Sequence, residues 1–461
     1  MAGSRKRIKA YLHVLPLLAI LVLFPLTLYV PQPSRIIMVG LDAADWDIIN
    51  PLLEVGRLPN IQRIVDGGVI SKIETDEPSI SPAVWTTIST GVTRKAHGLA
   101  GFVIPGTNTP YNSSMRKVPA VWNILSHYGK HVGIVGHWTT WPAEKVNGEM
   151  VSSYVSYDPG EGARLYYKGM LRKETNIPEQ TYPPGLIDDL EPYIVTSNDI
   201  THEDLQRFFN IDDWNDPDYY VKQLGEALTY IIPWTHAADK THFDVFEYLR
   251  HNKGPYDYIF TYIEGTDVTG HRFWQFYNTE YLDQAMEHWG YDLSKKEKYI
   301  KAFGDTINRY YEWADECIGE VISDMGPRDT LIVLSDHGFG PFKSGAGYSE
   351  DDERHTFSGD HAHFGVIMFY GANVKKGYRI QGPPPRLTDV MPTALTLMKL
   401  PMAQYLEGRV IWDAISDRFA STYREQWIRS YGIEQQFGKQ TKENPLDQEL
   451  VRRMKSLGYL Q

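Results

Sequence analysis

The segment Arg35-Ile-Ile-Met-Val-Gly-Leu-Asp42 gives the clearest indication of fold class in this 461-residue chain. It has the length of a strand, is almost wholly apolar, and runs straight into a carboxylate. A run that is apolar on both faces predicts a strand buried on both sides, as in parallel sheets covered by helices. Similar apolar runs recur at residues 132–136, 258–263, 330–334 and 366–370. Helix-like segments lie between these runs, which predicts an α/β fold: an open, mostly parallel sheet with helices on both faces.

Two regions of the chain depart from this alternation. Residues 154–250 are rich in Asp, Glu, Tyr and Pro and lack strong apolar runs, which predicts an inserted cap region over the site. A surface decoration that never touches substrate is the alternative. The tail, residues 416–461, is polar, and an amphipathic helix is expected over residues 444–457. The main domain is therefore expected to span residues 34–415.

The N-terminus carries a membrane signal. Four basic residues lie within residues 1–9, and residues 10–30 contain no Asp, Glu, Lys or Arg. About 20 such residues are enough to cross a bilayer as a helix. No small-x-small cleavage site follows, so we expect an uncleaved transmembrane signal anchor rather than a cleaved signal peptide. The basic flank predicts a single-pass protein with a cytoplasmic N-terminus and its body outside, in the periplasm or the extracellular space.

Composition excludes several classes of function. The formal net charge of −12 argues against a general nucleic-acid-binding or anionic-membrane surface. The single cysteine, Cys317, excludes an intramolecular disulfide and any cysteine-based metal cluster. It lies in a helix-like stretch, where a small buried residue is expected rather than a reactive thiol.

Acidic residues stand at or just beyond the ends of three apolar runs. Asp42 follows the first run, Asp267 comes shortly after residues 258–263, and Asp336 with His337 follows residues 330–334. In open α/β sheets ligands bind beyond the carboxyl ends of the strands, so these side chains are expected to converge. A single Asp after a strand is usually only a cap or turn residue.

The neighbours of these acids favour a metal site. Asp267 and His271 form D-x-x-x-H, a spacing that puts both side chains on one face of a helix. The segment Gly-Asp-His361-Ala-His363 supplies further imidazoles just before the run at 366–370. Asp and His without thiolate suit zinc, or less selectively manganese or iron. The candidate ligands are too many for one tetrahedral zinc, so two divalent metal ions are expected.

A hydroxyl-rich segment offers a nucleophile. Residues 78–91 hold six serine or threonine side chains before Gly91. A serine or threonine at a helix start is usually a cap, yet a hydroxyl beside a metal is deprotonated more easily and helix N-termini favour phosphate. From these residues alone the choice stays open among Ser81, Thr86 and Thr87.

Five motifs follow one another in a specific order. They are G-L-D-A-A-D-W at 40–46, S-P-A-V-W-T-T-I-S-T-G-V-T-R-K-A-H-G at 81–98, D-x-x-x-H-R-F-W at 267–274, S-D-H-G-F-G at 335–340 and G-D-H at 359–361. This order resembles the alkaline phosphatase superfamily, and within it the type I phosphodiesterase/nucleotide pyrophosphatase-like branch. The resemblance spans residues 35–411 and implies that residues 34–415 form the catalytic domain.

The resemblance also implies roles for single residues. The family nucleophile stands ten residues before the glycine of a T-G pair, which favours Ser81 over Thr86. Its last histidine ligand stands four residues before a glycine, which favours His361 over His363. The implied metal ligands are Asp267, His271 and His361 for one ion, and Asp42, Asp336, His337 and the Ser81 oxygen for the other. His363 and Arg272 are left as candidates that either support the metal ligands from behind or contact the substrate.

The activity that the resemblance implies is hydrolysis of phosphate esters, foremost phosphodiesters, through a phosphoenzyme on Ser81. The expected substrate is a small molecule or a lipid head group. Alternatives are a phosphomonoesterase, or a phosphomutase or phospho-head-group transferase of the same superfamily. A sulfatase is not expected, because Cys317 lacks the C-x-P-x-R context. The remote alternative is a non-catalytic, membrane-anchored binding ectodomain that kept the fold.

Overall fold

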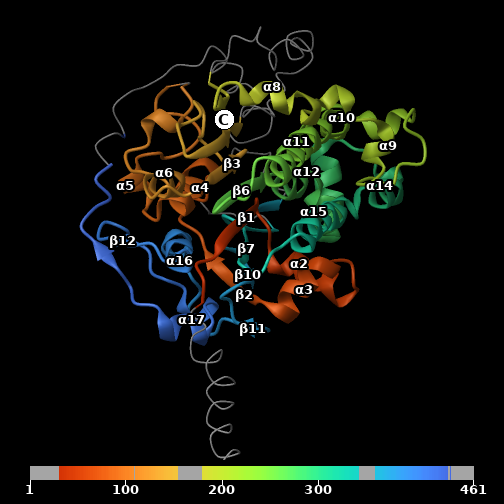
Figure 1. The fold of residues 1–461 in the computed structure, drawn as a ribbon. Helices are drawn as coiled ribbons and strands as arrows, with labels where there is room; N and C mark the ends of the chain where they lie inside the picture. The colour runs from red at the N-terminus through yellow and green to blue at the C-terminus, as the bar shows by residue number, and fades with distance from the viewer. Residues whose placement is uncertain (1–30, 108, 154–178, 342–358, 434–436, 438–461) are drawn as a thin grey trace, which may run out of the picture.

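The structure is a computed structural model that describes residues 31–107, 109–153, 179–341, 359–433 and 437 (Figure 1). The expected transmembrane segment 10–30, residues 154–178 of the expected cap region and the expected tail helix 444–457 lie outside the described residues. No helix within the described ranges has the length and apolar character needed to cross a membrane.

A nine-stranded sheet forms the centre of the molecule, in the order β11-β2-β10-β7-β1-β6-β3-β4-β5. The strands are β1 (Arg35–Leu41), β2 (Val69–Glu74), β3 (Val132–Val135), β4 (Gly148–Val151), β5 (Thr181–Tyr182), β6 (Tyr258–Ile263), β7 (Asp329–Leu334), β10 (Phe364–Gly371) and β11 (Tyr378–Arg379). All five apolar runs of the sequence are strands here, and β1 pairs in parallel with both β6 and β7. The expected α/β class with a mostly parallel sheet is therefore confirmed.

The direction of β10 differs from a purely parallel arrangement. It runs antiparallel to both of its neighbours, β2 and β7, and β5 runs antiparallel to β4. An apolar run looks the same in either direction, because direction depends on the connection that precedes the strand. Here β10 follows the short strands β8 (Gly338–Pro341) and β9 (Gly359–Ala362), which pair antiparallel.

Helices cover both faces of the sheet, because β1 sends alternate side chains to two separate cores. Ile37, Val39 and Leu41 pack in one core, and Ile36 and Met38 pack in the other. The first core holds α2 (Trp46–Glu54), α3 (Pro59–Gly67), α11 (Ile232–Asn252), α12 (Gly265–Tyr277) and α15 (Thr306–Ser323). The second holds α4 (Ser81–Thr90), α5 (Arg94–His97), α6 (Val121–His127) and α16 (Val390–Leu397).

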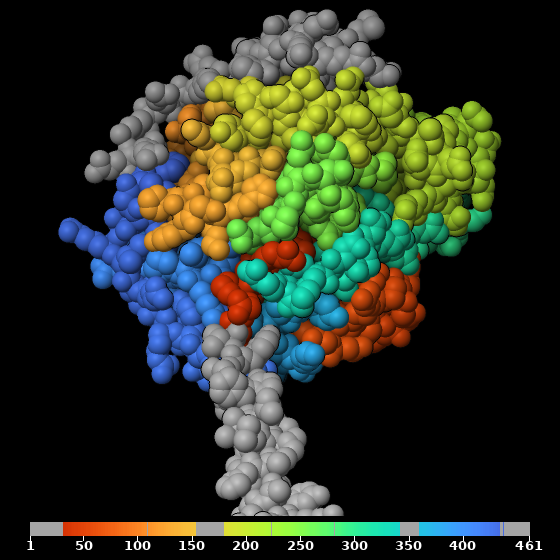
Figure 2. Space-filling model, in the orientation of Figure 1, coloured from red at the N-terminus to blue at the C-terminus, as the bar shows by residue number. Residues whose placement is uncertain are grey.

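The expected inserted region gathers at one end of the molecule, where residues from about 180 to 250 form the yellow and green end in Figure 2. Its described part contains α8 (Leu186–Leu190), α9 (His202–Leu205), α10 (Lys222–Glu226) and α11. Most residues of α11 are buried, and this helix packs against β6 and β3. The last helix of the inserted region, α11, is therefore one of the helices packed directly on the sheet and does not lie above the fold as a cap.

The other α-helices and strands of the described residues are α13 (Leu282–Trp289), α14 (Lys296–Phe303), α17 (Asp417–Thr422), β12 (Met402–Ala403) and β13 (Trp427–Ile428).

A glycine sets the distance between α4 and the sheet. A Cβ atom on Gly40 would lie 2.4 Å from Cη2 of Trp85, which is fully buried on α4. Only a residue without a side chain lets the indole approach β1 this closely. The strand that ends at Asp42 and the helix that begins at Ser81 are thereby packed directly on each other.

Candidate active site

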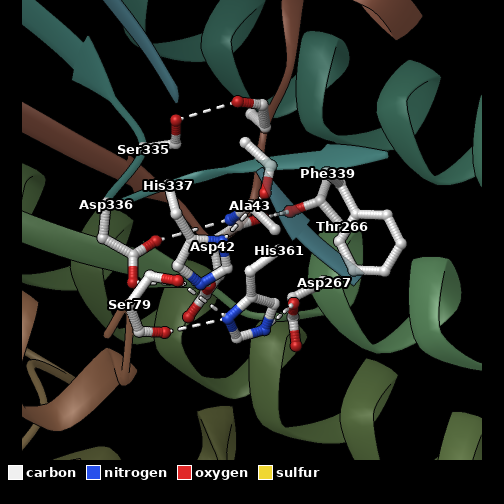
Figure 3. Close-up of polar contacts among 12 residues, drawn as sticks. Asp42, Ala43, Ser79, Thr266, Asp267, Ser335, Asp336, His337, Phe339 and His361 are labelled. Atoms are coloured by element: carbon white, nitrogen blue, oxygen red, sulfur yellow. Dashed lines mark hydrogen bonds and ion pairs between the residues drawn. The ribbon is translucent and has the colours of Figure 1, made fainter. Parts of the chain in front are cut away.

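The candidate residues meet at one edge of the sheet. Leu41 of β1 is in register with Ile263 of β6, and Gly40 is in register with Leu334 of β7, so the three strands end together. Asp42 directly follows β1, Asp267 lies in the first turn of α12 after β6, and the pair at 336–337 follows β7. Figure 3 shows these side chains pointing toward one another from different strand ends. The convergence expected from the sequence is present.

Asp42, Asp336 and His337 form what we call the carboxylate-rich group. His337 Nε2 lies 3.4 Å from Asp42 Oδ1 and 3.5 Å from Asp336 Oδ2. None of the three side chains is more than 1% exposed. The three facing atoms, Asp42 Oδ1, Asp336 Oδ2 and His337 Nε2, have no hydrogen-bond partner among the described residues. Buried polar atoms are almost always satisfied, so three such atoms facing one point call for a ligand.

The pKa values of the carboxylate-rich group also indicate that it needs a ligand. Burial and the charge of Asp267 raise the pKa of Asp42 to about 7, although the hydroxyl of Tyr262 opposes the shift. Burial and the neighbouring Asp42 raise the pKa of Asp336 well above its usual range. Burial, with the charge of His361, holds the pKa of His337 well below its usual value. Two carboxylates and a neutral imidazole are thus held together where a cation would stabilise their charged forms.

Asp267, His271 and His361 form what we call the histidine-rich group. Asp267 Oδ1 lies 3.4 Å from Nε2 of both histidines, and the two Nε2 atoms are 3.1 Å apart. Burial favours the neutral carboxyl, but the charges and hydrogen bonds of the two histidines outweigh it and hold the pKa of Asp267 well below its usual range. Burial likewise favours a neutral His361, yet Asp267 outweighs it and raises the pKa of His361 to about 9.

His361 reaches this place from the β8–β9 hairpin. It is in register with Phe339, and its Nδ1 donates to the carbonyl oxygen of Ser79, 2.8 Å away. The Ser79 hydroxyl lies 3.3 Å from the same nitrogen. That contact fixes the ring so that Nε2 faces Asp267, as a metal-ligating histidine requires.

The two other candidates lie differently. The side chain of His363 is 43% exposed and contacts Glu74 and Glu77 outside the two groups. The structure therefore places His361, not His363, among the clustered donors. Arg272 follows His271 on α12 and is partly buried.

The hydroxyl-rich segment forms α4, and Ser81 is its first residue, 2% exposed. Thr86 and Thr87 lie further along the helix and bond within the fold. Thr86 donates to the carbonyl oxygen of Pro82, and Thr87 contacts His97 Nε2 at 3.1 Å. Since Ser79 holds His361, the chain enters α4 beside the histidine-rich group. Of the three candidate hydroxyls, Ser81 stands at the start of α4 and is the nearest in sequence to Ser79, which contacts the histidine-rich group.

The two groups fit divalent cations. Ligand atoms of Asp42, Asp336 and His337 lie within 4.8 Å of one another, and so do those of Asp267, His337 and His361. His337 therefore borders both sets, and its ring stacks on that of His361 at 3.8 Å. A donor set of carboxylate and imidazole with no thiolate suits zinc, manganese or iron.

Several supporting residues escaped the sequence analysis. The hydroxyl of Tyr262 donates to Asp42 Oδ2, and Thr266 Oγ1 donates to the carbonyl oxygen of Asp42. Asp239 of α11 accepts hydrogen bonds from the backbone N–H groups of residues 264 and 265, and so holds the start of α12. Tyr262 lies inside an apolar run and resembles a core residue, while Asp239 is distant in sequence. Of these residues, only Thr266 could have been identified from the sequence, because it stands next to Asp267.

The strand ends thus gather the Asp and His donors that the sequence resemblance to the alkaline phosphatase superfamily implies. The sequence model of type I phosphodiesterase/nucleotide pyrophosphatase matches residues 36–381. The chain belongs to this family, which makes it a phosphoester hydrolase of the superfamily. No curated protein sequence matches the chain.

Solved structures show distant likenesses. Murine ectonucleotide pyrophosphatase/phosphodiesterase 5, solved as an inactive form in complex with AMP, is 13% identical, with a TM-score of 0.48 and coverage of 83% of this chain and 100% of that one. The wild-type alkaline phosphatase PafA is 12% identical, with a TM-score of 0.43 over 84% and 100% of the two chains. A 2-O GAG sulfatase is 12% identical, with a TM-score of 0.47 over 83% and 74%. None of these likenesses bears on the role of a residue here.

Proposed function

We propose that the protein is a two-metal phosphodiesterase that acts through a covalent phosphoserine on Ser81. The observation that carries the proposal is the carboxylate-rich group, whose three facing atoms are buried and find no hydrogen-bond partner in the described part of the chain. It stands beside a second carboxylate–imidazole group at the sheet edge, within the region that the family model matches. Divalent metals at these groups would supply Lewis-acid stabilisation of the phosphoryl oxygens and of the attacking and leaving oxygens.

The residues of the chain perform the remaining work. Asp267, His271 and His361 are assigned to one cation, and Asp42, Asp336, His337 and the Ser81 oxygen to the other. The Ser81 hydroxyl attacks phosphorus in line and displaces the first ester oxygen, and the Ser81 proton passes through solvent to that oxygen, which leaves as an alcohol. Water then attacks the phosphoserine, releases the phosphate monoester and returns Ser81 to its hydroxyl form. Packing of Trp85 on Gly40 holds α4, and hence Ser81, against the strand that presents Asp42.

The test is turnover of bis(p-nitrophenyl) phosphate and of p-nitrophenyl phosphate by the purified full chain, with and without chelator. We expect chelator-sensitive cleavage of the diester, lowered about a thousandfold or more in Ser81→Ala. Bound metal and the far-ultraviolet circular dichroism should stay unchanged in that variant. Ser89→Ala is the matched control, because its hydroxyl only donates to the Thr86 carbonyl oxygen on the same helix.

The alternatives predict other outcomes of the same assay. Cleavage of the monoester alone would assign the protein to the phosphomonoesterases. A chain that binds metal but turns over neither ester would favour a mutase, a head-group transferase or the binding ectodomain. A chain without metal would contradict the proposal.

We also propose that residues 10–30 anchor the protein, with residues 34–415 outside the cytoplasm. The support is the uncharged run behind a basic flank in the sequence. Protease treatment of intact cells tests this placement: the body should be cleaved without permeabilising the inner or plasma membrane.

A further inference from the structure

A chain of two hydrogen bonds ends on the oxygen of Asp42 that does not face His337. Trp138 Nε1 donates to the Tyr262 hydroxyl oxygen at 2.8 Å, and that hydroxyl donates to Asp42 Oδ2. A phenol has one proton, and here Asp42 receives it. Of the two carboxylate oxygens, Oδ2 is therefore held, whereas Oδ1 faces His337 without a hydrogen-bond partner among the described residues.

The phenol is fixed in place by its surroundings. Tyr262 is 3% exposed and packs edge-on against Trp85, with ring centroids 5.2 Å apart. The carbonyl of Asp42 accepts from Thr266, so both its main chain and its side chain are held by residues of the β6–α12 junction. A rotation of the carboxylate would break the bond with Tyr262. The arrangement thus leaves Oδ1 as the oxygen of Asp42 that would face a cation.

The loop that carries Trp138 is held in an unusual conformation. Thr139 has φ of 59°, a left-handed value that β-branched residues rarely adopt. Its hydroxyl donates to the Trp138 carbonyl oxygen at 2.7 Å and lies 3.2 Å from the Thr86 hydroxyl of α4. Such strain persists only where neighbouring contacts enforce it, and it concentrates at functional sites. Here it ties the position of Trp138 to the helix that begins with Ser81.

We propose that Tyr262 and Trp138 are positioning residues in series: Trp138 orients the Tyr262 hydroxyl, and Tyr262 orients Asp42 for its cation. This inference rests on the proposed function, because it needs a cation at the carboxylate-rich group. Groups behind a metal ligand commonly change metal affinity by about 10- to 100-fold. Tyr262 acts directly on Asp42, and Trp138 acts only through Tyr262.

The experiment measures metal affinity rather than turnover. Zinc-loaded full chains of wild type and variants are titrated with a zinc chelator, and the zinc that remains bound is measured by mass spectrometry. Tyr262→Phe keeps the ring against Trp85 and removes only the hydroxyl. We expect the lower of the two zinc affinities to be at least tenfold lower in this variant than in wild type. Tyr258→Phe is the matched control: it lies on the same strand and its hydroxyl contacts Met38 Sδ, away from the site. Its zinc affinity should stay within twofold of wild type.

We call the series from Trp138 through Tyr262 to Asp42 the relay. A double-mutant cycle distinguishes the relay from a general loss of packing around the site. Trp138→Phe alone should weaken zinc several-fold, but should add nothing in the Tyr262→Phe background, because it acts through the same hydroxyl. Additive effects would overturn the series. If wild type binds two zinc ions and Tyr262→Phe stays within twofold, the relay is wrong while the proposed function stands. If wild type binds no zinc, manganese or iron, the proposed function fails and the relay with it.

Discussion

The carboxylate-rich and histidine-rich groups lie side by side yet solve opposite electrostatic problems. The histidine-rich group sets one carboxylate between two imidazoles, and the pKa of Asp267 is held low while that of His361 rises to about 9. The carboxylate-rich group sets two carboxylates beside one imidazole, and the pKa values of Asp42 and Asp336 rise instead. One group can neutralise itself, whereas the other needs an added cation.

Exposure divides the two groups in the same way. The side chains of His271 and His361 are each 15% exposed, whereas those of Asp336 and His337 are fully buried. Burying charge is tolerated only when it is paired, so the deeper group has the greater electrostatic demand and the smaller internal supply. The difference suggests that the metal-free protein is strained at one group and stable at the other.

The largest expected effect is an opposite change of stability on removing one charge from each group. In the metal-free protein, Asp267→Asn should lower the free energy of unfolding by about 3–5 kcal/mol, because it leaves two imidazoles without their buried carboxylate. Asp336→Asn should not lower it, because burial and Asp42 already raise the pKa of Asp336 well above its usual range, so that its ionised form is disfavoured there. Urea unfolding after chelation and dialysis measures both.

Loading with zinc supplies the control for this pair. With metal bound, both variants should be less stable than wild type, since each has lost a charged ligand. A metal-free Asp336→Asn that loses as much stability as Asp267→Asn would break the comparison, because the two groups would then carry equal internal compensation.

A smaller effect concerns the pH dependence at Asp42. Its pKa of about 7 in the folded, metal-free protein lies above its ordinary value of 3.8. The cost of ionising it is absent below pH 3.8, grows between pH 3.8 and 7, and is constant above. Relative to wild type, metal-free Asp42→Asn should therefore gain stability across this window, on the order of 4 kcal/mol at its upper end.

Asp267→Asn gives the matched profile. Because the folded pKa of Asp267 is depressed, its contribution is fully present above pH 3.8 and is lost only as the pH falls below that value. The difference between wild type and this variant should be flat from pH 5 to 6.5, as followed by thermal unfolding. Above pH 6.5 it should shrink, because Asp267 also raises the pKa of His361 to about 9 and this contribution is lost as the pH rises through that value. A slope between pH 5 and 6.5 would show that Asp267 is not held ionised by its histidines.

The two groups also differ in how far the sequence predicts them. Asp42 and Asp336 could be placed because each ends a buried strand, and the ends of neighbouring parallel strands meet. The choice of His361 over His363 came from the family pattern, and in the structure only His361 lies among the donors. Tyr262 could not be identified, because a buried tyrosine in an apolar strand looks like core until its hydroxyl partner is known.

Contacts between distant segments mark the limit of local pattern. The antiparallel direction of β10 depends on the β8–β9 hairpin before it, and the anchoring of α12 depends on Asp239, more than twenty residues upstream. Strand content follows from apolar runs, but direction and support follow from which segments meet in space. The sequence motifs therefore place the candidate ligands better than they place the residues that support them.

The smallest expected effect comes from two glycines that support one group each. Gly40 lies two residues before Asp42, and a Cβ there would meet Trp85 at 2.4 Å; Gly265 lies two residues before Asp267, and a Cβ there would meet Tyr310 at 2.0 Å. Each change to alanine should cost about 1–3 kcal/mol by overpacking.

Gly40→Ala should weaken metal binding at the carboxylate-rich group and slow turnover, since it shifts α4 and Asp42 apart. Gly265→Ala should disturb the histidine-rich group instead. Trp85→Phe replaces the indole, whose outer ring would clash, with a smaller ring. It should therefore restore much of the stability lost in Gly40→Ala and none of the stability lost in Gly265→Ala. Rescue of both variants would show that the two glycines do not support the two groups separately.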